Sequence, residues 1–197
     1  MRALAAVLRR PKGYFCFVHT PATIAPATLA DAPALAQLIN QAYRGEAALA
    51  GWTTENQLFE GPRLNESHVS KMALLTRDHH ATLLKYVAAD GQLLGCVYLE
   101  PKGKRLYLST LAVAPAAQAQ GVGRQLLAAA EAQARQQGCG RIIISVLSAR
   151  PELLAWYERH GYQRTGRSKP FPATVQFGRP RQPLTLVELE LSVATDK

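Results

Sequence analysis

The chain has 197 residues, of which 48% are hydrophobic and 19% are charged, and its formal net charge is +9. This length fits one domain of ordinary size, and the hydrophobic fraction excludes a disordered polar tail. No stretch approaches the roughly 20 consecutive apolar residues of a membrane-spanning helix, so no membrane association is expected. The cysteines, Cys16, Cys96 and Cys139, show neither metal-ligand spacing nor a disulfide framework. A cytoplasmic location and no metal site are therefore expected.

The positive charge raises the alternative of a nucleic-acid-binding module. Much of it lies in two stretches without acids, residues 1–21 and the segment from Arg159 to Val187. Neither stretch interleaves basic and aromatic residues as a base-stacking platform does. A positive field would serve a polyanionic cofactor equally well, so nucleic acid is the weaker hypothesis.

Residues 1–21 are expected to form an N-terminal extension, 22–191 a single domain, and 192–197 a C-terminal tail. The domain is predicted to begin with a strand at Ala22–Ala27. The segment Thr28–Asp31 has capping-box spacing and precedes apolar residues at helical intervals, which predicts a helix at Leu29–Arg44. A second helix is predicted at Asn65–Leu75, and Gly45–Arg63 between the two helices shows no clear pattern.

The middle of the chain changes to strands. Leu83–Ala89 and Gln92–Glu100 flank the dipeptide Asp90-Gly91, which is a strong hairpin signal. A turn at Pro101–Lys104 leads into another strand at Arg105–Val113. These segments predict an antiparallel meander.

The last part of the domain alternates helices and strands. Helices are predicted at Gly121–Gln137 and Pro151–His160, with a strand buried on both faces at Arg141–Leu147 between them. Tyr162–Arg164 and Leu184–Leu191 are expected to close the sheet. The fold class is therefore α/β (α+β), with a mixed, mostly antiparallel sheet flanked by helices.

The segment Leu111–Leu127 (LAVAPAAQAQGVGRQLL) carries the strongest chemical signal. A strand ends, Pro115 turns the chain, and a glycine-containing loop opens directly into a helix, so N–H groups and the positive helix end converge. Gly121 and Gly123 remove side chains where a phosphate-bearing ligand would approach the backbone. The segment lacks both the Gly-Lys-Ser/Thr of a Walker loop and the third glycine of a dinucleotide fingerprint. A plain strand-to-helix hinge is the simpler alternative.

The segment Gln118-Ala-Gln-Gly-Val-Gly123 is similar to the Q/R-x-x-G-x-G/A motif of the GNAT acetyltransferases, with LAV-P before it and LL after it. Arg150–Tyr162 (RPELLAWYERHGY) resembles the family's later helix and its YE-x-x-GY/F ending. The two motifs stand in the family's order, and the resemblance covers residues 22–191. It implies the GNAT fold with splayed central strands, acetyl-CoA (coenzyme A) as cofactor, and an acyltransferase activity.

The resemblance also implies which residues bind the cofactor. The backbone of Leu111, Ala112 and Val113 would bind the acetyl and pantetheine part between the splayed strands. The pyrophosphate would lie on the loop formed by Gln118, Ala119, Gln120, Gly121, Val122, Gly123 and Arg124. The family often has Asn where this chain has Arg150, which would reach pantetheine or phosphate.

Tyr157 matches the tyrosine that often serves as general acid in the family. A phenol with a pKa of about 10 can protonate the departing coenzyme A thiolate, and the N–H of Leu111 would stabilise the oxyanion. The simpler interpretation of Tyr157 is a core aromatic beside Trp156 and Tyr162.

The base and the acceptor site have several candidates. Glu100 is a candidate general base at a strand end, with a solvated surface charge as the alternative. Glu46 and Glu55 would attract a cationic amine, unless they are ordinary surface carboxylates. Phe171 and Phe177 lie in a long Pro/Gly-rich segment and would either wall the acceptor pocket or pin the loop to the core.

The sequence thus predicts an acetyl-CoA-dependent N-acetyltransferase that acts on a primary amine of a small molecule or peptide. No cysteine lies in either motif, so direct transfer is expected rather than an acetyl-enzyme. A non-catalytic acetyl-CoA sensor is the alternative, against which Tyr157 argues. Homodimers are common in the family, so a homodimer is one expectation, by analogy alone.

Overall fold

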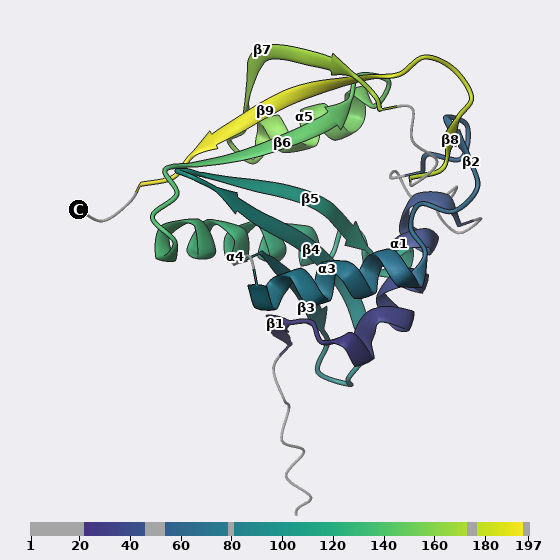
Figure 1. The fold of residues 1–197 in the computed structure, drawn as a ribbon, viewed down its shortest axis with the longest axis vertical. Coiled ribbons are helices and arrows are strands. Elements are labelled where there is room, and N and C mark those ends of the chain that lie inside the picture. Colours follow the sequence, from purple (N-terminus) through teal and green to yellow (C-terminus); the bar gives the residue numbers. More distant parts are fainter. Residues whose placement is uncertain (1–21, 46–53, 79–80, 173–176, 195–197) are drawn as a thin grey trace, which may run out of the picture.

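A computed structural model describes residues 22–45, 54–78, 81–172 and 177–194. Its main element is a seven-stranded sheet in the order β1-β3-β4-β5-β6-β9-β7 (Figure 1). All neighbouring strands pair antiparallel except β5 and β6, which are parallel. In spatial order the strands are β1 (Thr23–Pro26), β3 (Thr82–Val87), β4 (Leu93–Lys102), β5 (Arg105–Val113), β6 (Arg141–Leu147), β9 (Thr185–Ser192) and β7 (Gln163–Pro170). The predicted fold class is confirmed.

Helices cover both faces of this sheet. They are α1 (Ala32–Arg44), α3 (Glu66–Asp78), α4 (Val122–Gln136) and α5 (Pro151–Arg159). Successive side chains of a strand point to opposite faces, so Leu83 belongs to the core cluster that includes residues of α1 and α3, while Leu84 belongs to the cluster that includes residues of α4 and α5. Because helices cover both faces of the sheet, side chains on both faces of the central strands are buried, which explains their nearly continuous apolar runs. In β6 only Arg141 and Ser145 are exposed.

The first helix begins with a short 3₁₀ turn (Leu29–Asp31) rather than as one continuous α-helix. The N–H and hydroxyl of Thr28 donate to Asp31 Oδ2 at 2.7 and 2.9 Å. Lys85 of β3 donates to Asp31 Oδ1 at 2.7 Å, which ties the start of the helix to the sheet. The capping role predicted for Thr28 and Asp31 is thus confirmed.

The centre of the sheet opens between β5 and β6. These strands pair only where Arg105–Tyr107 faces Arg141–Ile143, and beyond that point they separate (Figure 1). On the other edge of β5, the register with β4 shifts between Cys96 and Tyr98. Thr110, in the irregular part of β5, has a positive φ of 51°. The predicted splay is therefore present, and the irregular backbone lies beside it.

The C-terminal part differs from the sequence prediction. The sequence pattern ends this strand at Arg164, but β7 continues to Pro170. The pattern is misleading because β7 lies at the sheet edge, where nearly all of its side chains are exposed and show no apolar alternation. Its register with β9 also shifts between Arg164 and Ser168. Likewise, β4 runs to Lys102, past the predicted turn start at Pro101.

A second sheet is absent from the sequence prediction. It pairs the two-residue strands β2 (Phe59–Glu60) and β8 (Arg179–Pro180), which are too short to have a periodic signal. At the chain end, β9 reaches Ser192 and Val193 is buried. The proposed extension at 1–21 lies outside the described residues.

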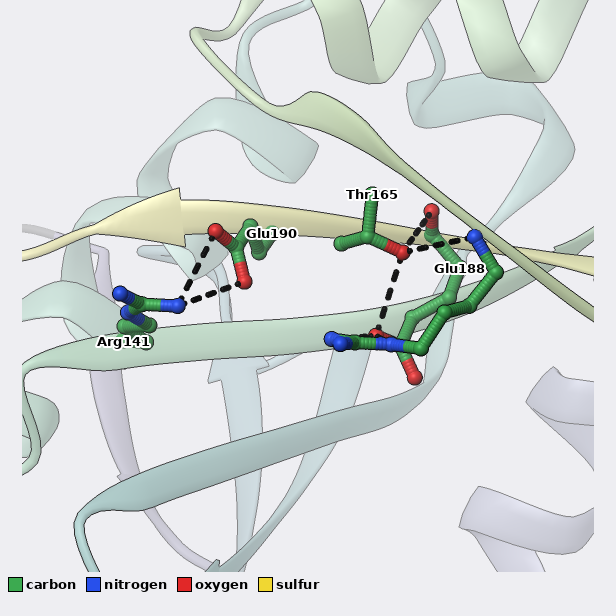
Figure 2. Close-up of polar contacts among 5 residues, drawn as sticks. Arg141, Thr165, Glu188 and Glu190 are labelled. Carbon is green, nitrogen blue, oxygen red and sulfur yellow. Dashed lines mark hydrogen bonds and ion pairs between the residues drawn. The ribbon is translucent and has the colours of Figure 1, made fainter.

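Polar pairs cross the outer strands β6, β9 and β7 (Figure 2). Arg141 of β6 contacts both carboxylate oxygens of Glu190 on β9 at 3.3 Å. Glu188 of β9 accepts hydrogen bonds from Thr165 at 3.3 Å and from Arg167 Nε at 2.8 Å, both on β7. Exposed pairs of this kind contribute little individually, but they favour the observed registers of β9 on β6 and of β7 on β9.

Candidate active site

A cavity of about 640 Å³ lies where β5 and β6 separate. Its wall is mostly apolar and comes from α1, β5, the loop before α4, and α5. The lining residues are Ala42, Tyr43, Leu111, Ala112, Val113, Ala117, Gln118, Ala119, Gly121, Gly123, Arg124, Arg150, Glu152, Leu153, Ala155, Trp156, Tyr157, Arg159 and His160. We call this space the larger cavity. Its size and lining suit an elongated organic ligand.

The loop before α4 forms one end of the larger cavity. Gly121 is the N-cap of α4 with a φ of 84°, and Ala119 also has a positive φ, 60°. The first N–H groups of α4 have no acceptor within the helix, and they carry the positive end of its dipole. Gly123 packs closely against α5, since a Cβ there would lie 3.3 Å from the ring of Trp156. This loop can therefore receive a phosphate.

Nearly all of the residues predicted to bind the cofactor line this cavity, although they come from separate segments. The exceptions are Gln120 and Val122. The side chain of Gln120 donates to the carbonyl of Ala116 at 2.8 Å on the surface. Val122 is 4% exposed and packs in the core, which leaves only its main chain for a ligand.

Tyr157 lines both the larger cavity and the gap in the sheet, and it is 6% exposed. Its ring makes edge contacts with Trp156 and Tyr162, at centroid distances of 4.9 and 5.4 Å. Burial raises the pKa of Tyr157 well above its ordinary value of 10. The hydroxyl therefore stays protonated at neutral pH and can act as a donor. Both interpretations of Tyr157 apply, because the residue is a packed aromatic that also faces the cavity.

Tyr43 is a site residue that the sequence did not indicate. It lies in the last turn of α1, and its hydroxyl donates to the carbonyl of Leu111 at 2.8 Å. Burial raises the pKa of Tyr43 to about 12. An aromatic residue on an amphipathic helix has no local signal of function, so only the tertiary structure places it beside β5.

Arg150 precedes α5 and is 4% exposed. Its guanidinium forms an ion pair with Glu152 in the first turn of the helix. The predicted contact with the cofactor would thus come from a buried cation that already has an acidic partner. This pairing lowers the cost of keeping the arginine charged in the protein interior.

A second, smaller cavity of about 100 Å³ meets the larger one at the gap in the sheet. Five residues line both cavities: Tyr43, Leu111, Arg150, Leu153 and Tyr157. Glu55, Arg63 and Phe171 line the smaller cavity only. The predicted wall residue Phe171 therefore faces this space, and it also packs edge-on against Phe59 at 5.0 Å. Phe177 contacts the guanidinium of Arg63 at 4.9 Å.

The carboxylates proposed as bases or amine-binding groups occupy different places. Glu55 is 6% exposed, faces the smaller cavity, and pairs with Arg44 at 3.2 Å. Glu100 lines neither cavity; its carboxylate pairs with Lys102 on the surface at 2.9 Å. Glu46 lies outside the described residues. The structure thus brings Glu55, and not Glu100, to the site.

Within the described ranges, no helix is long and apolar enough to cross a membrane. In the same part of the chain, no group of His, Cys, Asp or Glu side chains is arranged to hold a metal ion.

The chain is similar to known acetyltransferases in parts of its sequence. The chain is 35% identical over 85 residues to mycothiol acetyltransferase from Jonesia denitrificans, covering 42% of this chain and 27% of that protein. It is 38% identical over 65 residues to an acetyltransferase from Agrobacterium fabrum, covering 33% of this chain and 46% of that protein. The matches therefore span less than half of the length of these relatives.

The fold is similar to that of yncA from Salmonella typhimurium, whose structure was solved with its cofactor acetyl-CoA. The TM-score is 0.66 at 18% identity, over 90% of this chain and 97% of that one. A model of the acetyltransferase (GNAT) family matches residues 38–162, which is more than half of the chain. The chain therefore belongs to the GNAT family of acetyltransferases, as its two motifs predicted.

Proposed function

We propose that the chain is an N-acetyltransferase that binds acetyl-CoA in the larger cavity and transfers the acetyl group directly to a primary amine. The amine, from a small molecule or a peptide, would enter through the smaller cavity. The observation that carries the proposal is the meeting of the two cavities at Leu111 and Tyr157, where β5 and β6 separate. Two reactants bound on opposite sides of this gap would be close enough to react.

The larger cavity suits the shape and charge of acetyl-CoA. The pyrophosphate would accept hydrogen bonds from the N–H groups around Gly121, Gly123 and Arg124 at the start of α4. The apolar stretch along Leu111, Ala112 and Val113 would receive the pantetheine arm. The complex of yncA with acetyl-CoA supports this choice of cofactor.

Bound acetyl-CoA supplies an activated thioester, and the protein residues position the reactants and move protons. Tyr157 would donate its proton toward the leaving sulfur, which its high pKa permits at neutral pH. The N–H of Leu111 would stabilise negative charge on the carbonyl oxygen during attack. Tyr43 holds the carbonyl of Leu111 at 2.8 Å, and so it would fix the orientation of this residue's main chain.

The amine must lose a proton before it attacks. We propose Glu55 as the carboxylate that attracts the incoming ammonium, because Glu55 is buried at the smaller cavity, whereas the candidate base Glu100 lines neither cavity. Its carboxylate forms an ion pair with Arg44 at 3.2 Å, which holds it in a fixed position.

The test is a turnover assay with acetyl-CoA and a panel of primary amines. Release of free thiol would be followed by absorbance, and mass spectrometry would identify the acetylated product. We expect amine-dependent thiol release above the rate of background hydrolysis. Binding of acetyl-CoA without transfer to any amine would contradict the proposal and favour the non-catalytic sensor.

A further inference from the structure

The charges around the smaller cavity do not balance. Arg44 pairs with Glu55 at 3.2 Å, and Arg150 pairs with Glu152. Arg63 also lines this cavity, yet it has no acidic partner among the residues that the structure describes. The described wall of the smaller cavity therefore carries one positive charge in excess.

The main chain at Arg63 is fixed to α1 by Asn40. The N–H groups of Arg63 and Leu64 donate to Asn40 Oδ1 at 2.6 and 3.2 Å. In return, Asn40 Nδ2 donates to the carbonyl of Leu64 at 2.6 Å. Because the Asn40 side chain both accepts and donates hydrogen bonds with this segment, it holds Arg63 at a defined distance from Tyr43. Tyr43 lies one turn after Asn40 on α1.

The guanidinium of Arg63 is held in place by aromatic rings. Its central carbon lies 5.1 Å from the ring centroid of Tyr43 and 4.9 Å from that of Phe177. The Nε atom is buried and has no hydrogen-bond partner within the described part of the chain. A buried donor without an acceptor is costly, and a positioned guanidinium is suited to bind a carboxylate through two parallel hydrogen bonds.

This cation lies next to the reaction centre. The ring of Tyr43 contacts Arg63, and the hydroxyl of the same residue binds the carbonyl of Leu111 at the gap in the sheet. Glu55, which would attract the ammonium, lines the same cavity of about 100 Å³. The cation Arg63, which has no acidic partner among the described residues, and the anion Glu55 within so small a space match a molecule that carries both an amine and a carboxylate.

On the basis of the proposed function, we infer that the acceptor is a small amino-acid-like molecule whose carboxylate binds Arg63. The carboxylate would accept hydrogen bonds from the guanidinium while the amine faces Leu111 and Tyr157. A polyamine would instead meet an uncompensated positive charge, which disfavours a second ammonium group.

The experiment compares acceptors that differ only in the carboxylate. The sets are leucine with leucinamide and isoamylamine, and phenylalanine with its amide and phenethylamine. We expect kcat/KM for the free acid to exceed that for its amide and its decarboxylated amine by about 10- to 100-fold, which is typical of a buried charge-assisted contact. The amides are stringent controls, because their amines lose a proton more readily than those of the acids.

Arg63→Gln should abolish this preference while the dissociation constant of acetyl-CoA stays unchanged, and Arg63→Lys should restore part of it. Arg181→Gln is the matched control, since Arg181 forms an exposed pair with Glu60 at 3.0 Å and lines neither cavity. Equal or better use of the acceptors that lack a carboxylate by the unmodified protein would overturn the inference, as would a preference that survives Arg63→Gln. In both cases acetyl transfer itself would still occur, whereas failure of the proposed function would leave every acceptor unreacted.

Discussion

The two cavities share five residues but differ in how they are built. The larger cavity is mostly apolar, and its wall comes mainly from two continuous segments, residues 111–124 and 150–160. The smaller cavity holds Glu55 and Arg63, and its wall is assembled from segments between Tyr43 and Leu186. Long-range polar contacts hold it together, such as the bond at 3.0 Å from Arg44 Nη2 to the carbonyl of Phe177.

This difference separates two tasks. A cofactor common to a whole family can be bound by main-chain groups and apolar surface, which tolerate many side chains. An acceptor must be distinguished from other amines, and this needs charged groups in fixed positions. Substitutions at the larger cavity should therefore alter cofactor affinity, and those at the smaller cavity should alter the use of the acceptor.

The largest effect is expected at the junction of the two cavities. Tyr157→Phe should lower kcat about 100-fold, because it removes the proposed general acid while the ring remains packed. The dissociation constant of acetyl-CoA should stay within about twofold, as measured by binding titration. Tyr162→Phe is the matched control, since Tyr162 is also buried and contacts Tyr157, and its hydroxyl has no partner in the described part of the chain. Unchanged kcat in Tyr157→Phe would remove this residue from the mechanism.

The pH dependence of kcat gives an independent test of the same residue. A general acid is lost when the pH rises through its pKa, and the pKa of Tyr157 is raised well above 10. The acid form should therefore persist to about pH 10, and kcat should show no decline from Tyr157 below that pH. A decline between about pH 8 and pH 10 that is absent in Tyr157→Phe would contradict this assignment.

The next largest effect concerns the larger cavity alone. Gly121→Val should raise the dissociation constant of acetyl-CoA by about 10- to 100-fold, because a β-branched residue is strained at a φ of 84° and would distort the phosphate loop. Gly91→Val is a matched control, since Gly91 has a φ of 86°, also has free space around it, and lies in the hairpin between β3 and β4. Equal loss of affinity in both variants would show that the loop has no specific role.

A smaller effect is expected at the support of the smaller cavity. Asn40→Ala removes the hydrogen bonds to Arg63 and Leu64 and should lower the free energy of unfolding by about 2 kcal/mol. It should also raise KM for the acceptor several-fold without changing cofactor affinity. Asn65→Ala controls for lost stability, because Asn65 Oδ1 accepts the N–H of His68 at the start of α3, away from both cavities. A loss of cofactor affinity in Asn40→Ala would contradict the assignment of cofactor binding and acceptor binding to separate cavities.

The smallest effect is expected away from both cavities. Arg141→Gln removes an exposed pair with Glu190 on the outer strands and should change the free energy of unfolding by less than about 0.5 kcal/mol. Denaturant titration would measure this change. The dissociation constant of acetyl-CoA and KM for the acceptor should both be unaffected. A loss above about 1 kcal/mol would show that the cross-strand pairs fix the position of β9.

Most residues that line the junction of β5, the glycine loop and α5 in the larger cavity could be named from the sequence because their signals are local. A glycine loop next to a helix start and the helix at Pro151–Arg159 each lie within one short segment. The smaller cavity could not be predicted in this way. Arg63 lies in a segment without a pattern, and its position depends on Asn40 and Phe177, which are far away in the chain.

The position of Glu100, which lines neither cavity, could not be predicted for the same reason. Its strand was predicted correctly, but the side chain lies far along β4 from the gap, beside Lys102. Only the pairing of β4 with β5 shows that Glu100 lies opposite Tyr107 rather than the residues around Leu111. A charge at a strand end therefore indicates function only when the sheet register is known.

Calorimetric titration of the purified chain with acetyl-CoA tests the central claim most directly, with ATP and NAD as controls. Our account predicts saturable binding at one site per chain, selective for acetyl-CoA and weakened in Gly121→Val but not in Arg63→Gln. Absence of acetyl-CoA binding by a folded sample, or equal binding of ATP and NAD, would contradict the assignment of the larger cavity.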